Sequence, residues 1–104
     1  TISSPRTIIC GQHYLNFASH GDTVATPLVA QVALRALQSA AAATLGAVYV
    51  DFHAYMRDLI VAGTYTQGAD TDWHVAVGNT HLNNTGEQIL ADAIFAAMQA
   101  QGWA

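Results

Sequence analysis

The segment "TPLVAQVALRALQSAAAATLGAVYVDF", residues 26–52, decides the fold because it joins the features of a helix to those of a strand. Thr26 can cap a helix, and Pro27 suits a first helical turn. Gly46 is typical of a helix end. The mostly apolar run 47–52 then has the composition of a strand that is buried on both faces. We therefore expect a helix followed directly by a strand.

Another strand is expected before this segment. The stretch "RTIICG", residues 6–11, is a short β-branched run that ends at a glycine, and we expect it to be buried on both faces. A strand, a helix and a second strand in this order form a crossover unit, which pairs the two strands in parallel. Cys10, the single cysteine, should be a small buried side chain, and it leaves the cellular compartment undecided.

Two further helices are predicted downstream. The stretch "HAYMRDLIVAG", residues 53–63, has the pattern of a short helix closed by its last glycine, and a surface loop should follow it. Thr85 and Gln88 form a capping-box pattern at the start of a terminal helix that should stop near Gly102. One face of that helix is apolar, and its members are Ile89, Leu90, Ala93, Ile94 and Met98.

The composition indicates that part of the structure lies elsewhere. The 104 residues suffice for one small domain, 52% are hydrophobic and only 10% are charged, so we expect something to cover part of the surface. Two strands do not bury themselves, because sheets usually have about four to six strands. We therefore predict an α/β fold with a parallel sheet in a three-layer, flavodoxin-like sandwich. Residues 1–104 would be its C-terminal half, and the partner would be an upstream half on the same polypeptide or on a cleaved companion chain.

Several classes of function are not expected. The net charge is −4, with three arginines and no lysine, so the chain lacks the clustered cations that nucleic-acid binding needs. No apolar run reaches the roughly 18 residues of a membrane span. Neither a His-x-x-x-His spacing nor a cysteine pair is present, so we expect no metal site and no other cofactor.

The stretch "HLNNTG", residues 81–86, follows a loop and leads into the terminal helix. Together with the order of the elements before it, His81, Leu82, Asn83 and Gly86 resemble the last sequence block of the SGNH (GDSL-type) hydrolase family, His-(Pro/Leu)-Asn-x-x-Gly. The resemblance implies a serine esterase or deacetylase, with an ester or an acylated sugar as substrate. It implies that His81 is the general base and that the upstream half supplies the serine nucleophile.

Two departures from the family pattern bear on this interpretation. The family usually has an aspartate three residues before the histidine, to orient the imidazole, and this chain has Gly78 there. Asp72, from the preceding loop, is our candidate for the orienting residue. The stretch "GDT", residues 21–23, resembles the Gly-Asp-Ser motif with threonine in place of serine, but it lies too far past its strand, and we expect an ordinary loop.

The sequence leaves three alternatives open. The chain can be a binding or structural module that retains the fold without activity, an interpretation that Gly78 favours. Thr1 can be a terminus made by self-cleavage, with its amine activating its own hydroxyl. His81 can also be a polar loop residue that helps Asn83 or Asn84 to start the helix.

The remaining histidines are expected to be structural. His74 stands next to Trp73 and should form a packed aromatic pair with it. His53, at the end of a strand, should cap or pack. His13 and His20 belong to the loop after the first strand, where we expect them at the surface.

Overall fold

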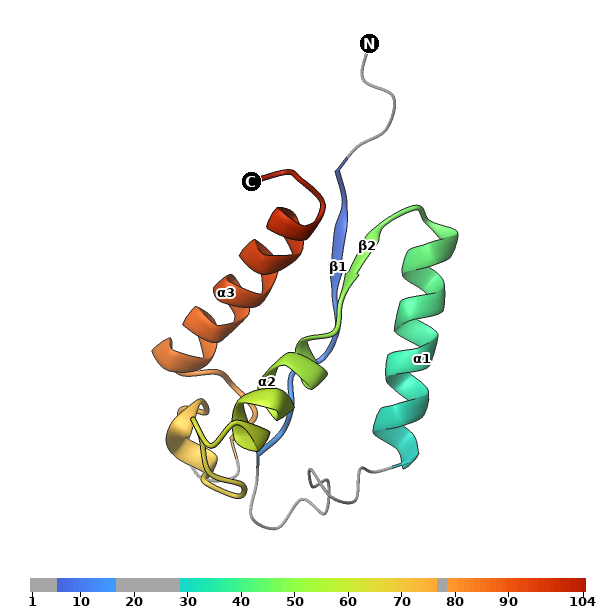
Figure 1. Ribbon diagram of the computed structural model, residues 1–104. Helices are drawn as coiled ribbons and strands as arrows, with labels where there is room; N and C mark the ends of the chain where they lie inside the picture. The colour runs from blue at the N-terminus through green and yellow to red at the C-terminus, as the bar shows by residue number, and fades with distance from the viewer. Residues whose placement is uncertain (1–5, 17–28, 77–78) are drawn as a thin grey trace.

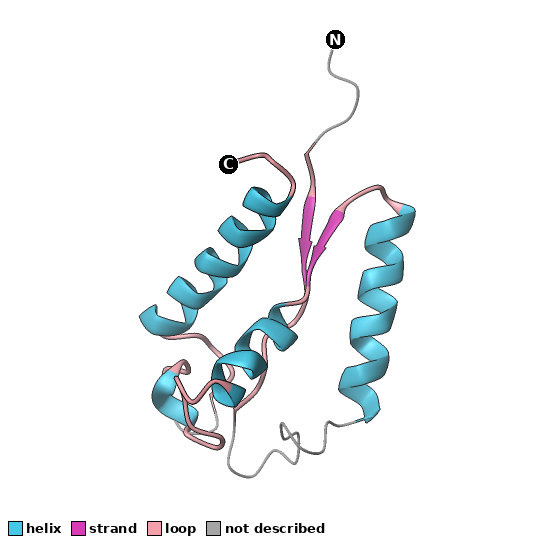
Figure 2. Cartoon of the chain, viewed as in Figure 1, coloured by secondary structure: helices cyan, strands magenta, loops and turns pink. Residues whose placement is uncertain are grey.

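The computed structural model describes residues 6–16, 29–76 and 79–104 of the chain. Two strands pair in parallel, with Ile8 opposite Val48 and Cys10 opposite Val50. The chain is therefore a mixed α/β structure built on the predicted crossover unit (Figures 1 and 2). In chain order its elements are β1 (Ile8–Cys10), α1 (Val29–Thr44), β2 (Val48–Val50), α2 (Phe52–Val61), the short 3-10 helix η1 (Asp70–Asp72) and α3 (Asn84–Ala100).

Helices α1 and α3 cover opposite faces of the strand pair. Side chains alternate between the two faces along a strand, so neighbouring residues of β2 contact different helices. The hydroxyl of Tyr49 on β2 donates a hydrogen bond to Gln38 on α1 (3.2 Å). Val50, the next residue, is buried in one cluster with Ile89 and Ala93 of α3. Figure 1 shows the strands between these two helices. A helix therefore lies on each side of the sheet.

The predicted end of α1 is confirmed. Gly46 has a positive φ of 68°, a left-handed conformation that glycine adopts without steric cost. The amide of Ala47 then donates back to the carbonyl of Ala42 (2.9 Å), which closes the helix before β2 begins. Thr26 and Pro27, the predicted start of this helix, lie outside the described residues.

Helix α3 starts one residue after Asn83, so the capping box predicted from Thr85 and Gln88 was wrong. The side-chain oxygen of Asn83 accepts a hydrogen bond from the amide of Gly86 (2.9 Å) and caps the helix. Thr85 is already inside the first turn and is exposed. Asparagine caps at least as well as threonine, and Asn83 comes first in the chain.

The buried core is small and lies around the carboxyl ends of the strands. Its members are Tyr14, Val50, Phe52, Met56, Trp73, Ile89 and Ala93.

The expectation that β1 is buried on both faces was wrong for this chain. Ile8 and Ile9 are half-buried and Cys10 is exposed, because β1 is hydrogen-bonded to β2 alone in the described part and its other edge is open. No helix in that part is long and apolar enough to cross a membrane.

Candidate functional site

His81 lies on a short loop that precedes α3 and is closed by backbone hydrogen bonds. An isolated antiparallel bridge joins His74 to Leu82 across the base of the loop. The amide of Val75 donates to the carbonyl of His81 (3.0 Å). The amide of His81 donates to the side-chain oxygen of Asn79 (2.9 Å). The backbone of His81 is thus held on both sides, and its side chain is exposed.

Asn83 connects this loop to the segment before it. Besides capping α3, its side-chain nitrogen donates to the carbonyls of Thr71 (3.0 Å) and His74 (3.1 Å). One amide side chain therefore satisfies three backbone groups from two segments. A side chain without an amide group would leave some of these backbone groups without a partner, which is a physical reason for asparagine at this place in the motif.

Gly86 and Leu82 have structural roles as well. Gly86 is buried, and a Cβ atom there would lie 2.5 Å from the carbonyl oxygen of Trp73. Only glycine lets the first turn of α3 pass this backbone without a clash. Leu82 packs against the core cluster. Three of the four motif residues thus shape the loop, and His81 is the one whose side chain the fold leaves exposed.

The chain that leaves β1 is tied to the same region through Asn16, which is fully buried. Its amide donates to Nε2 of His74 (3.3 Å). Its side chain donates to the carbonyl of Thr66 (2.8 Å) and accepts from the amide of Gly68 (2.7 Å). The loop of His81 is therefore anchored beyond the carboxyl end of β1, the edge where open α/β sheets gather functional groups.

Two of the histidines pack as predicted. His74 is fully buried beside Trp73, with ring centroids 6.3 Å apart, and His53 is buried with its ring 5.1 Å from that of Tyr14. Burial lowers the pKa of His74 below 6.5, and the charge of a protonated His13 nearby lowers it further. His74 is therefore a neutral member of the core near neutral pH.

His13 is not at the surface as expected but half-buried, so that prediction was wrong. The segment after β1 packs against residues 66–74, and the ring centroids of His13 and His74 are 5.4 Å apart. Burial lowers the pKa of His13, although a hydrogen bond to the backbone of Thr80 partly opposes the shift. His20 lies outside the described residues.

Asp72, the candidate orienting residue, belongs to η1 and is half-buried. Its Oδ2 atom accepts a long hydrogen bond from the amide of Thr66 (3.4 Å). Within residues 6–16, 29–76 and 79–104, no hydrogen bond or ion pair joins Asp72 to His81. Its orienting role stays a prediction, and Gly78 lies outside the described residues.

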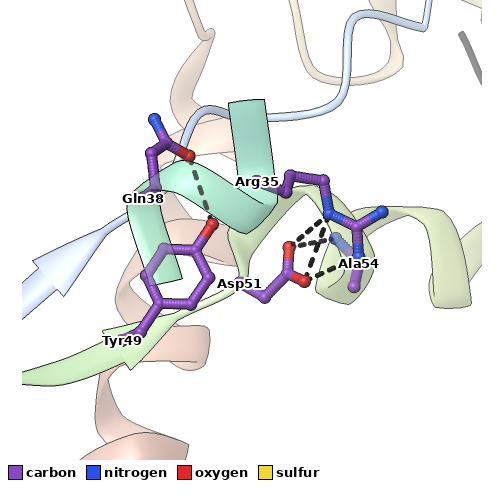
Figure 3. A network of polar contacts seen from close by, with 5 residues as sticks. All are labelled: Arg35, Gln38, Tyr49, Asp51 and Ala54. Atoms are coloured by element: carbon purple, nitrogen blue, oxygen red, sulfur yellow. Dashed lines mark hydrogen bonds and ion pairs between the residues drawn. The ribbon is translucent and has the colours of Figure 1, made fainter. Parts of the chain in front are cut away.

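An ion pair at the end of β2 was missed by the sequence analysis (Figure 3). Arg35 on α1 donates to both oxygens of Asp51, from Nε at 3.0 Å and from the terminal nitrogen at 2.6 Å. Asp51 also caps α2 by accepting from the amide of Ala54 (3.1 Å). Burial alone would raise the pKa of Asp51, but these hydrogen bonds outweigh it and hold the pKa below 3.8. One feature of the sequence could have indicated this ion pair: Arg35 is the only charged residue of α1.

The described residues contain no group of three or more His, Cys, Asp or Glu side chains that could hold a metal ion. No family model, no curated protein and no solved structure matches the chain. Membership of the SGNH hydrolase family therefore stays a prediction that rests on the motif at residues 81–86 and on the order of the elements around it.

Proposed function

We propose that this chain is the C-terminal part of an SGNH-type serine hydrolase that cleaves carboxylic esters, with His81 as its general base. The observation that carries the proposal is the exposed imidazole of His81 on a loop anchored beyond the carboxyl end of β1. Three neighbouring motif residues hold that loop in place, and none of them competes for the imidazole. An upstream half of the same domain would supply the serine and the oxyanion donors.

In this proposal His81 acts as a general base and then as a general acid. As the serine oxygen attacks the ester carbonyl carbon, one imidazole nitrogen takes the hydroxyl proton. The bond from carbon to the alcohol oxygen then breaks, and the same proton passes to the leaving alcohol. In the second half of the reaction, His81 takes a proton from water as the water oxygen attacks the acyl carbon. The bond from this carbon to the serine oxygen then breaks, the proton passes from His81 to the serine, and the carboxylic acid leaves. An acylated carbohydrate is the substrate class that we propose, from the family resemblance.

The test of this proposal is His81→Ala in the full-length polypeptide, assayed with a nitrophenyl ester. Loss of a general base should lower kcat by about 100-fold or more. Because the side chain of His81 is exposed, the near-ultraviolet circular dichroism of the variant should match the wild type. Thr85→Ala is the matched control, since Thr85 belongs to the same motif and is also exposed. Wild-type turnover in His81→Ala would contradict the proposal.

The role of Asp72 is separable by Asp72→Asn. The asparagine oxygen can still accept from the amide of Thr66, so the loop should keep its stability while the negative charge is lost. If Asp72 orients the imidazole, this variant loses activity with its melting temperature unchanged. Full activity would leave Asp72 as a structural residue of η1.

A non-catalytic module that keeps the fold is the second candidate function. One observation favours it: the ring of His81 makes no hydrogen bond within the described part of the chain, so nothing there fixes its tautomer. A fluorophosphonate probe, which labels activated serines, separates the two candidates. Labelling that disappears in His81→Ala supports the hydrolase, and a full-length protein that never labels supports the module. Thr1, on which the self-cleavage alternative rests, lies outside the described residues.

A further inference from the structure

We infer that His74 is a positioning residue for His81, and that it fulfils this role only while its own ring is neutral. The ring of His74 accepts a hydrogen bond from the segment after β1, and the backbone of His74 pairs with the loop that carries His81. The catalytic part of this inference rests on the proposed function, and the structural part does not. From the sequence, His74 was expected only to pack against Trp73.

The side chain of His74 binds the chain that leaves β1. The backbone amide of Asn16 donates to Nε2 of His74 (3.3 Å), and both residues are fully buried. A backbone amide can only donate, so Nε2 presents its lone pair and the proton of the neutral ring lies on Nδ1. The His74 ring also packs at 5.4 Å from the ring of His13 and at 6.3 Å from that of Trp73. Its orientation is therefore set by one directional bond and two ring contacts.

The backbone of His74 belongs to the base of the loop that carries His81. An antiparallel bridge joins His74 to Leu82, and the next amide, that of Val75, donates to the carbonyl of His81 (3.0 Å). The carbonyl of His74 accepts from the side chain of Asn83 (3.1 Å). A displacement of about 1 Å at a general base can cost about 100-fold in rate. A shift of the His74 ring is therefore passed to the backbone on which the position of His81 depends.

Protonation of His74 is incompatible with this arrangement. A proton on Nε2 replaces the lone pair that the amide of Asn16 requires, so two N–H groups would face each other in a buried site. Burial lowers the pKa of His74 below 6.5, a charge on His13 of the segment after β1 lowers it further, and Asp70 on η1 opposes both. His53 on α2 contributes through His13, whose pKa its charge lowers.

The bond between Asn16 and His74 should therefore be intact at neutral pH and lost in acid. Because the pKa of His74 in the folded chain lies below 6.5, an opened loop takes up the proton first as pH falls below 6.5, and its population rises. The loss is complete below the pKa of the folded chain. Protonation of His81 also reduces kcat in acid, so the wild-type rate should fall more steeply than a single protonation allows.

Two substitutions in the full-length protein test the positioning role. His74→Gln can place its side-chain oxygen near the position of Nε2, where it accepts from the amide of Asn16 and does not titrate. It should keep most of kcat at neutral pH and show a less steep acid limb than the wild type. His74→Phe keeps an aromatic ring beside Trp73 and removes the acceptor. Its kcat should fall about 10- to 100-fold with KM nearly unchanged, since the base is displaced while the substrate site is not.

Nitrogen-15 NMR of the wild-type ring needs neither activity nor a variant that folds. At neutral pH the proton of His74 should be on Nδ1, and the ring should titrate with a midpoint below 6.5. Hydrogen exchange then follows the bond itself. The protection of the Asn16 amide, corrected for its intrinsic exchange rate, should fall from neutral pH to about pH 5 in the wild type and stay constant in His74→Gln.

Tyr14→Phe is the control for these exchange measurements. It removes the hydrogen bond between the Tyr14 hydroxyl and Gln67 from the same segment and leaves the acceptor on His74 in place. The dependence of Asn16 protection on pH should therefore match that of the wild type.

A proton on Nε2 of His74 at neutral pH would overturn the inference, and so would Asn16 protection that falls with acid as much in His74→Gln as in the wild type. Wild-type kcat in a folded His74→Phe would overturn the positioning role. The failure of the proposed function looks different. In that case His81→Ala keeps its activity or the wild type has none, while the ring proton of His74 and the exchange of the Asn16 amide still report whether the two segments are coupled.

Discussion

Gly86 lies where the first turn of α3 passes the carbonyl of Trp73. In Gly86→Ala the new methyl group would sit 2.5 Å from that oxygen and 2.8 Å from a methyl group of Leu82, so backbone or side chain must shift. Overpacking of this kind costs about 1–3 kcal/mol, and we expect the free energy of unfolding in urea to fall by this amount. The expected loss is structural and should precede any effect on chemistry.

Asn84→Ala is the control for this substitution, because Asn84 occupies the same turn but is exposed. Exposed positions away from caps usually change stability by less than about 0.5 kcal/mol. If Gly86→Ala is as stable as Asn84→Ala, the helix can move away from Trp73 and the close approach is not a constraint.

The predictability of single residues depended on how far apart in the chain their partners lie. His74 next to Trp73 was correctly expected to pack, because the partner is adjacent. The expectation that His13 lies at the surface was wrong. Its contacts with His74 and Thr80 join segments that are distant in sequence, so no local pattern encodes them. The capping box at Thr85 was wrong for a different reason: Thr85 and Asn83 both fit a cap in the sequence, and only the chain path into α3 selects between them.

At the scale of elements, the ion pair between Arg35 and Asp51 fastens α1 to the junction of β2 and α2 (Figure 3). Asp51→Asn should keep the cap on α2, since asparagine caps as well as aspartate, and should lose only the ion pair. The two side chains are 19% and 33% exposed, so we expect a loss of under about 1 kcal/mol in unfolding free energy. Asp51→Ala loses the cap too and should cost about 1 kcal/mol more.

Acid separates the two contributions of Asp51. Its pKa in the folded chain is below 3.8, so its charge stabilises the fold above that value and the contribution disappears as pH falls through the folded pKa. The stability gap between wild type and Asp51→Asn, measured by urea unfolding, should therefore shrink from neutral pH to about pH 2. A gap that is independent of pH would mean that the charge of Asp51 does not stabilise the junction.

The elements themselves were largely predictable. The helix α1, the strand β2 and the helix α2 follow from local periodicity and from glycines with positive φ at their ends, such as Gly46 and Gly63. The parallel pairing of β1 with β2 follows from the length of the connection between them, since a helix has to cross over. The extent of burial was not predictable, because it depends on what covers β1 and α1.

At the scale of the whole molecule, the described chain leaves much apolar surface uncovered. Its sheet has two strands, and a two-stranded sheet gains little stability by itself. Several large apolar side chains remain open to solvent: Val29 (84% exposed) and Leu37 (70%) on α1, Leu45 (72%) directly after it, and Phe95 (53%) on α3. A helix that faces water on its outer side normally carries charges there, and α1 has only Arg35, which faces Asp51.

The backbone of β1 indicates where a further strand would pair. The carbonyl of Thr7 and the amide of Gly11 bond to β2, and in a parallel pair alternate residues point to the same neighbour. The amides and carbonyls of Ile8 and Cys10 therefore point to the open edge. Unpaired edges of this kind favour association with another strand. We expect a strand of an upstream segment to occupy this edge.

This expectation can be measured with residues 1–104 expressed alone and together with the upstream segment. Alone, the chain should associate on size exclusion and give a poorly structured near-ultraviolet spectrum from Trp73 and Trp103. Together with the upstream segment, it should form a complex of one copy of each, in which the amides of Ile8 and Cys10 become protected from exchange, because only a strand beside β1 can hydrogen-bond them. If residues 1–104 alone run as a sharp monomer with a structured aromatic spectrum and cooperative melting, the open edge is tolerated and the half-domain interpretation fails.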